Sequence, residues 1–193
     1  MITNSLFREI CHKSFTKTAA AFSKFISAPI TIDALQLRKI KINEFVLRNS
    51  QEKIVNLYTP ITGNFNGFAF FSAFEKDAYH LCDKVLNRKK NGTCELADIE
   101  ISVLSETTNV LVGNYLTHFS HLLHTGVLFH KTSIIDCEKP DIIVMKAYSD
   151  LTKSLPEEAI LINTILQYEE ISMYLTYLFD HDSINYQILK LIA

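Results

Sequence analysis

The chain has 193 residues, of which 48% are hydrophobic and 21% are charged. Its 19 Lys and Arg against 21 Asp and Glu give a formal net charge of −2, which excludes a strongly basic nucleic-acid patch and an acidic tail. The composition excludes disorder and favours a folded globule that needs no disulfide or metal to build its core. An apolar window of about 18 residues is absent, as is a signal-peptide core, so we expect a cytoplasmic protein without membrane insertion.

The first half of the sequence is predicted to begin with an amphipathic helix at residues 4–27. Phe7, Cys11 and Phe15 recur there at helical spacing, and Pro29 ends the pattern. Three further features follow, namely extended segments between residues 30 and 61, a Gly-containing turn into a strand near residues 62–71, and a helix at 74–87.

The second half repeats this order after the polar run at residues 88–93. A long helix is predicted at 97–124 and a closing helix at 183–192, with extended segments at 127–135, 141–149, 159–168 and 171–179. Both halves therefore consist of a helix, strands and a helix. We interpret this as an internal duplication, with half-repeats of about 1–93 and 94–193 inside a single domain, 1–193.

Three polar residues stand out on the helix predicted at 97–124. Ser102, Glu106 and Asn109 are spaced at i, i+4 and i+7, which places them within an arc of about 60° on one stripe. The apolar stripe through Leu104 and Leu111 lies on the other side. The polar stripe is therefore predicted to face solvent or a partner, and an ordinary solvated helix face is the alternative interpretation.

The same kind of stripe recurs in the first half of the chain. Ser5, Glu9 and His12 lie 97 positions before Ser102, Glu106 and Asn109, respectively. Further on, Thr59 corresponds to Thr164 with a shift of 105. This recurrence favours a functional interpretation over a chance pattern.

These stripes and the segments around them carry a resemblance to a known family. The segments NSLFREICHKSFTKTAAAFSKFISAPITI, VNLYTPITGNFNGFAFFSAFEKDAYHLCDKVL and SVLSETTNVLVGNYLTHFSHLL resemble the CheC family of response-regulator phosphatases, which includes CheX and FliY. The family pattern is Asp or Ser, three residues, Glu, two residues and Asn, with a Pro some twenty residues later. The resemblance implies an α+β fold, with a mostly antiparallel sheet of about six strands and two long helices on one face, related by a pseudo-two-fold axis.

The resemblance also implies a site and an activity. Glu106 and Asn109 would be the catalytic pair, with a minor positioning role for Ser102, in a phosphatase of a phosphorylated CheY-like response regulator. An amide suits the positioning of the attacking water because it donates and accepts hydrogen bonds. A glutamate can pair with a lysine of the partner. The chain itself would hold no cofactor or metal, and Mg²⁺ is expected in the partner.

The first half departs from the family pattern at one catalytic position. His12 stands where the family has Asn. A neutral imidazole can still donate and accept, but it is bulkier and becomes cationic below about pH 6.5. We therefore expect the site of Ser5, Glu9 and His12 to be impaired.

The family's prolines are also missing from both halves. Ala34 or Leu35 occupies the expected place in the first half, and Thr132 or Ser133 in the second. These departures keep an alternative open, in which the chain is a non-catalytic CheC-like docking protein. It would then bind a response regulator, a CheD-like deamidase or a flagellar switch component.

A histidine series on the helix at 97–124 is the one pattern that suggests a metal. His118, His121 and His124 follow each other at spacings of three. Because each step turns by about 60° around the helix, their rings do not converge on one ion. We expect these histidines to face solvent or an interface.

Overall fold

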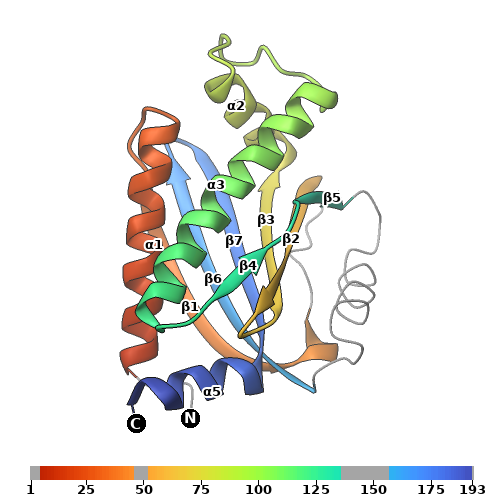
Figure 1. Cartoon of the computed structure of the whole chain (residues 1–193). Coiled ribbons are helices and arrows are strands. Elements are labelled where there is room, and N and C mark those ends of the chain that lie inside the picture. Colours follow the sequence, from red (N-terminus) through yellow and green to blue (C-terminus); the bar gives the residue numbers. More distant parts are fainter. Residues whose placement is uncertain (1–4, 46–51, 136–156, 193) are drawn as a thin grey trace.

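The computed structural model of the chain describes residues 5–45, 52–135 and 157–192 (Figure 1). The first half forms α1 (Ser5–Phe25), β1 (Thr31–Lys41), the 3₁₀ turn η1 (Ile42–Glu44), β2 (Ile54–Gly63), β3 (Gly67–Phe74) and α2 (Glu75–Val85). The second half forms α3 (Asp98–Leu122), β4 (Val127–Phe129), β5 (Ser133–Ile135), β6 (Glu158–Tyr168), β7 (Ile171–Asp180) and α5 (His181–Ile192). None of the helices in these ranges is long and apolar enough to span a lipid bilayer.

The strands of both halves join in one antiparallel sheet. Across the described ranges the sheet has seven strands in the order β1-β6-β7-β3-β2-β4, and β5 also pairs with β2. The first strand of each half pairs with strands of the other half, because β1 lies against β6 while β4 and β5 lie against β2. The predicted α+β fold with an antiparallel sheet is confirmed, with one strand more than expected.

Helices α1 and α3 lie side by side across one face of the sheet (Figure 1). Aromatic rings fill the space beneath them. The ring centroid of Tyr115 on α3 lies 4.4 Å from Phe15 on α1 and 4.1 Å from Tyr177 on β7. This packing explains the apolar periodicity of both helices, since their buried stripes meet over the sheet.

A glycine turn fixes where β4 begins. Gly63, at the end of β2, has a φ of +127°, and a Cβ there would lie 2.8 Å from the carbonyl oxygen of Gly126. The Asn64 N–H donates to that same oxygen at 3.0 Å. The close approach requires glycine at position 63 and holds the start of β4 against the β2–β3 turn.

The connection from α2 to α3 is fixed by two carboxylates. Asp83 accepts hydrogen bonds from the backbone N–H of Gly92 at 3.0 Å and from the N–H and hydroxyl of Thr93 at 2.8 and 2.6 Å. Glu100, in the first turn of α3, pairs with Arg88 at 2.5 Å and accepts the Ala97 N–H at 3.2 Å. These contacts set the position of the α3 N-terminus.

The helices lie where apolar periodicity predicts them, each within a few residues. Two strand predictions differ from the structure. The segment at 127–135 divides into the short strands β4 and β5, and the 3₁₀ turn η1 at Ile42–Glu44 includes the first two residues of the segment 43–48, which the alternation of apolar residues predicts as extended. The extended segment predicted at 141–149 lies outside the described residues.

Candidate functional site

The polar stripe of the second half lies on the outer side of α3. Leu104 and Leu111 are fully buried in the core, whereas Ser102 and Glu106 are exposed. Asn109 follows on the same side of the helix and is half-buried. The structure therefore brings these three predicted residues together on one surface.

Two threonines anchor the side chain of Asn109. The Thr132 hydroxyl donates to Asn109 Oδ1 at 2.6 Å, and its oxygen lies 2.6 Å from the hydroxyl oxygen of Thr59. Because a hydroxyl has a single proton, Thr59 must be the donor to Thr132. The three side chains form a short chain of hydrogen bonds, and both threonines are buried.

This anchor decides which groups of the Asn109 amide remain available. Oδ1 keeps a second lone pair, and Nδ2 carries two N–H donors. Within the part of the chain that the structure describes, Nδ2 has no hydrogen-bond partner. Asn109 can therefore donate to and accept from a water molecule at the surface while its orientation stays fixed.

The carboxylate of Glu106 lies about one helical turn before Asn109. Among the residues with described positions, none forms an ion pair with Glu106. Ser102 is exposed one further turn toward the N-terminus. The stripe thus presents an unpaired negative charge beside a neutral, anchored amide.

An apolar side chain borders the stripe one turn beyond Asn109. Phe129 of β4 packs across Gly113 of α3, where a Cβ would lie 3.2 Å from the Phe129 ring. The ring remains 43% exposed. We call the surface made by Glu106, Asn109 and Phe129 the α3 surface, and it combines charge, hydrogen-bonding groups and an apolar contact.

The stripe of the first half is exposed on α1 but differs in its contacts. Ser5, Glu9 and His12 all face solvent. Lys13 pairs with Glu9 at 2.6 Å, and the hydrogen bond and charge of Lys13 hold the pKa of Glu9 below its usual range. The carboxylate of this stripe is therefore already paired within its own helix.

The anchoring residue of the second half has no counterpart in the first. Thr164, which lies 105 positions after Thr59, donates to the backbone oxygen of Ala34 at 2.6 Å. Ala34 has no side-chain hydroxyl, so it cannot donate a hydrogen bond to a residue of α1 as Thr132 does to Asn109 on α3. No described side chain forms a hydrogen bond with the ring of His12. The two stripes thus share their position on the fold and differ in how their third residue is held.

The histidine series shows no arrangement suited to a metal. The rings of His121 and His124 lie 6.4 Å apart. Over residues 5–45, 52–135 and 157–192, no group of three or more His, Cys, Asp and Glu could hold a metal ion. His118 is half-buried on the same helix.

Sequence reasoning missed the contacts that complete the α3 surface. The sequence marks Thr132 only as a replacement for a proline, and its patterns indicate no role at the site for Thr59 or Phe129. Thr132 follows Asn109 by 23 positions, close to the place of the family's proline. That spacing was the one available signal, and it does not reveal the hydrogen bond.

Comparison with known proteins identifies the fold. No family model and no curated protein matches the sequence. Among solved structures, FliY from Thermotoga maritima is similar with a TM-score of 0.63 and 16% identity, over 95% of this chain and 92% of FliY. The chain has a CheC-like fold.

Two further structures share this CheC-like fold. The FliM middle domain from Vibrio alginolyticus has a TM-score of 0.62 and 11% identity, over 96% of this chain and 99% of that domain. CheX from Borrelia burgdorferi, solved as a CheX–CheY–BeF₃–Mg²⁺ complex, has a TM-score of 0.58 and 12% identity, over 89% of this chain and 98% of that chain. The resemblance to CheC, CheX and FliY proteins is therefore confirmed at the level of the fold.

Proposed function

We propose that this chain is a phosphatase that accelerates hydrolysis of the aspartyl phosphate of a CheY-like response regulator, in cytoplasmic chemotaxis or a related two-component pathway. The observation that carries the proposal is the anchored Asn109 beside the unpaired Glu106 on one face of α3. The CheC-like CheX of Borrelia burgdorferi was solved bound to CheY, which supports a regulator of this class as the partner.

The proposed reaction requires a water molecule in line with phosphorus. Asn109 would hold that water through Oδ1 and Nδ2, and the bond from Thr132 keeps the amide in one orientation. The water oxygen bonds to phosphorus as the bond from phosphorus to the aspartate oxygen breaks; the aspartate leaves as a carboxylate, and both protons of the water leave with the phosphate, as H₂PO₄⁻ or as HPO₄²⁻ and a proton given to solvent. Mg²⁺ and a lysine of the regulator would stabilise the charge, so we propose no cofactor in this chain.

The remaining groups of the α3 surface would bind and orient the regulator. Glu106 would pair with the regulator's lysine, since no lysine or arginine among the described residues forms an ion pair with its carboxylate. Phe129 would contact an apolar patch next to the phosphorylation site, and Ser102 would play a minor positioning role. The ion pair would fix the orientation of the regulator on the α3 surface, and the buried ring would add binding affinity.

A second candidate is a CheC-like docking protein that binds a regulator or a flagellar switch component without hydrolysis. The hydroxyl of Thr132 favours it, because it already occupies one lone pair of Asn109 Oδ1. The likeness to a FliM middle domain is compatible with either function. Nothing in the comparisons supports a CheD-like deamidase as a partner.

We further propose that the two halves arose by duplication and form one domain, 1–193. Each half contributes one helix of the pair α1 and α3 to the same face of the sheet. Thr59 and Thr164, which correspond in the repeat, both donate toward the segment where the family has its proline. A pseudo-two-fold relation between the halves follows from this proposal.

The phosphatase proposal is tested by following the decay of a phosphorylated CheY-like regulator from the same organism. We expect this protein to accelerate the decay. The Asn109→Ala variant should lose about a hundredfold of that acceleration, because the water loses its hydrogen-bonding partner. The Glu106→Ala variant should lose about tenfold, mainly through weaker binding of the regulator.

Glu9→Ala and His12→Ala are the matched controls, because they alter the equivalent stripe on α1. We expect both to retain the acceleration of the unaltered protein, since Glu9 is already paired with Lys13. Loss of activity in these variants would show that the active site lies on α1. Binding of the regulator without any acceleration of its dephosphorylation would contradict the phosphatase proposal and support the docking protein.

A further inference from the structure

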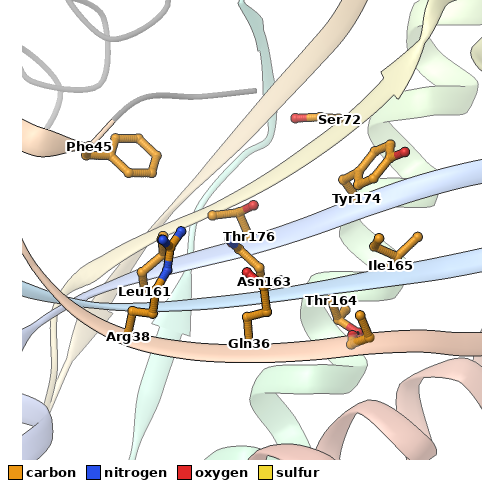
Figure 2. Close-up of a pocket in the computed structure, with 11 residues that line it drawn as sticks. Gln36, Arg38, Phe45, Ser72, Leu161, Asn163, Thr164, Ile165, Tyr174 and Thr176 are labelled. Atoms are coloured by element: carbon orange, nitrogen blue, oxygen red, sulfur yellow. The ribbon is translucent and has the colours of Figure 1, made fainter. Parts of the chain in front are cut away.

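A cavity of about 270 Å³ lies on the face of the sheet opposite to α1 and α3 (Figure 2). Ile160 and Ile162 of β6 belong to the core beneath the helices. Because side chains alternate along a strand, Leu161 and Asn163 point to the other face, where both line the cavity. The cavity is therefore separated from the α3 surface by the thickness of the sheet.

A row of polar side chains crosses the floor of this cavity. Gln36 of β1 pairs with Asn163 of β6, and Asn163 pairs with Thr176 of β7, so the three side chains are neighbours. Asn163 Oδ1 is buried and has no hydrogen-bond donor among the described residues. A buried acceptor without a donor is unfavourable, so this atom favours a bound group that carries an N–H or O–H.

The cavity also carries one unpaired positive charge. Figure 2 shows the Arg38 guanidinium rising from β1 between Phe45 and Asn163. Arg38 forms no ion pair with any described residue, and the described residues that line the cavity include no carboxylate. The electrostatics therefore favour an anion and disfavour a zwitterion, whose ammonium group would lack a counter-charge.

Apolar side chains form the remaining wall. Phe45 is 6% exposed and lies 5.4 Å from the ring of Phe70. Leu161 and Ile165 of β6 line the floor on either side of Asn163. This wall suits a short aliphatic chain.

We propose that this cavity binds a small organic monoanion with a carboxylate, an adjacent hydroxyl or N–H donor, and a short aliphatic chain, as in an α-hydroxy acid. The carboxylate pairs with Arg38, the donor bonds to Asn163 Oδ1, and the chain packs against Phe45 and Leu161. Arg38 and Asn163 are diagonal neighbours across β1 and β6, which suits two polar groups on adjacent carbons. The site is independent of the proposed phosphatase activity.

The test is isothermal titration of the full chain with four matched compounds, α-hydroxyisocaproate, isocaproate, α-hydroxyisocaproamide and leucine. We expect α-hydroxyisocaproate to bind with a dissociation constant of about 1 mM or below. Isocaproate lacks the donor for Asn163, the amide lacks the charge for Arg38, and leucine carries an uncompensated ammonium group. Each of the three should bind about tenfold more weakly or not at all.

Arg38→Gln and Asn163→Leu should each weaken binding of α-hydroxyisocaproate by about tenfold. Arg8→Gln, which removes an exposed arginine of α1, is the matched control and should leave binding unchanged. Thermal unfolding of each variant shows whether the fold is retained. No binding of any compound to the unaltered protein, or equal binding of all four, would overturn the proposal.

Discussion

Among the described residues, the Thr132 hydroxyl is the group that orients the amide of Asn109. An asparagine without such a partner keeps rotational freedom about its terminal bond, and ordering it on binding a water would cost free energy. The buried bond from Thr59 fixes the Thr132 hydroxyl in turn. His12 is the third residue of the stripe on α1, and no described side chain bonds to its ring. The presence of Thr132 beside Asn109 therefore explains why the two stripes are expected to differ in activity.

Thr132→Val is predicted to slow dephosphorylation about tenfold, because it removes the hydroxyl with little change of shape and frees the Asn109 amide. Binding of the regulator should change little, so the loss should appear at saturating regulator. Thr132→Ser keeps the hydroxyl and should keep most of the rate. A rate of Thr132→Val equal to that of the unaltered protein would show that Thr132 does not position Asn109.

Tyr177 offers a second prediction for one residue. Its hydroxyl is buried and has no hydrogen-bond partner among the described residues, and burial raises the pKa of Tyr177 well above its usual range. Tyr177→Phe removes the unpaired hydroxyl and should leave the free energy of unfolding unchanged or raise it by about 1 kcal/mol. Tyr177→Ala removes the ring stacked on Tyr115 and should lower it by about 3 kcal/mol or more. Urea unfolding measures both, and a destabilised Tyr177→Phe would reveal a hydrogen bond to that hydroxyl.

Among the structural elements, the connection from α2 to α3 determines where α3 starts. Burial alone would raise the pKa of Asp83, but the hydrogen bonds from Thr93 and from the backbone N–H groups of Gly92, Thr93 and Asn91 together hold it below its usual range. A carboxyl with a lowered pKa in the folded state stabilises the fold above its unfolded pKa of about 4, and this contribution is lost as pH falls through the folded value.

Asp83→Asn is therefore predicted to lower the free energy of unfolding by about 1–3 kcal/mol near pH 7, because the amide has one acceptor where the carboxylate has two. Below about pH 4 the difference between the variant and the unaltered protein should shrink, since the unfolded chain takes up a proton at Asp83 there, while the folded protein does so only at its lower folded pKa. Denaturant unfolding at both pH values measures this. A difference that stays constant with pH would contradict the assigned role of the carboxylate.

The elements also show what the sequence could predict. The helix α3 follows from its own residues, since Leu104 and Leu111 define a buried stripe and leave Glu106 and Asn109 outside. The division of residues 127–135 into two strands does not follow from those residues alone, because it depends on how they pair with β2. The bond from Thr132 to Asn109 arises at that break, so it depends on long-range geometry that apolar periodicity does not encode.

For the whole molecule, the decisive feature is the pairing of each half's first strand with the other half. β1 pairs with β6, and β4 and β5 pair with β2. Alone, residues 1–93 would leave β1 without its partner strand, and residues 94–193 would leave β4 and β5 without theirs. A two-stranded hairpin with helices on one face has little apolar area to stabilise it.

We therefore predict that neither 1–93 nor 94–193 folds when expressed alone. Both fragments should lack a cooperative thermal transition, whereas the full chain should unfold in a single one. Co-expression of the two fragments is the control, because it allows every strand pairing to form and lacks only the covalent link between the fragments. A cooperative transition in either isolated fragment would show that the half-repeats are separate domains.

The pairing of β1 with β6 has a consequence for synthesis on the ribosome. Lys41 pairs with Glu158, so β1 emerges more than a hundred residues before its partner strand. At about 5–20 residues per second, β1 therefore waits for several seconds without a partner strand. Three lysine and arginine side chains, Arg38, Lys39 and Lys41, lie exposed on this strand, and such charges discourage pairing with the edge of another nascent chain.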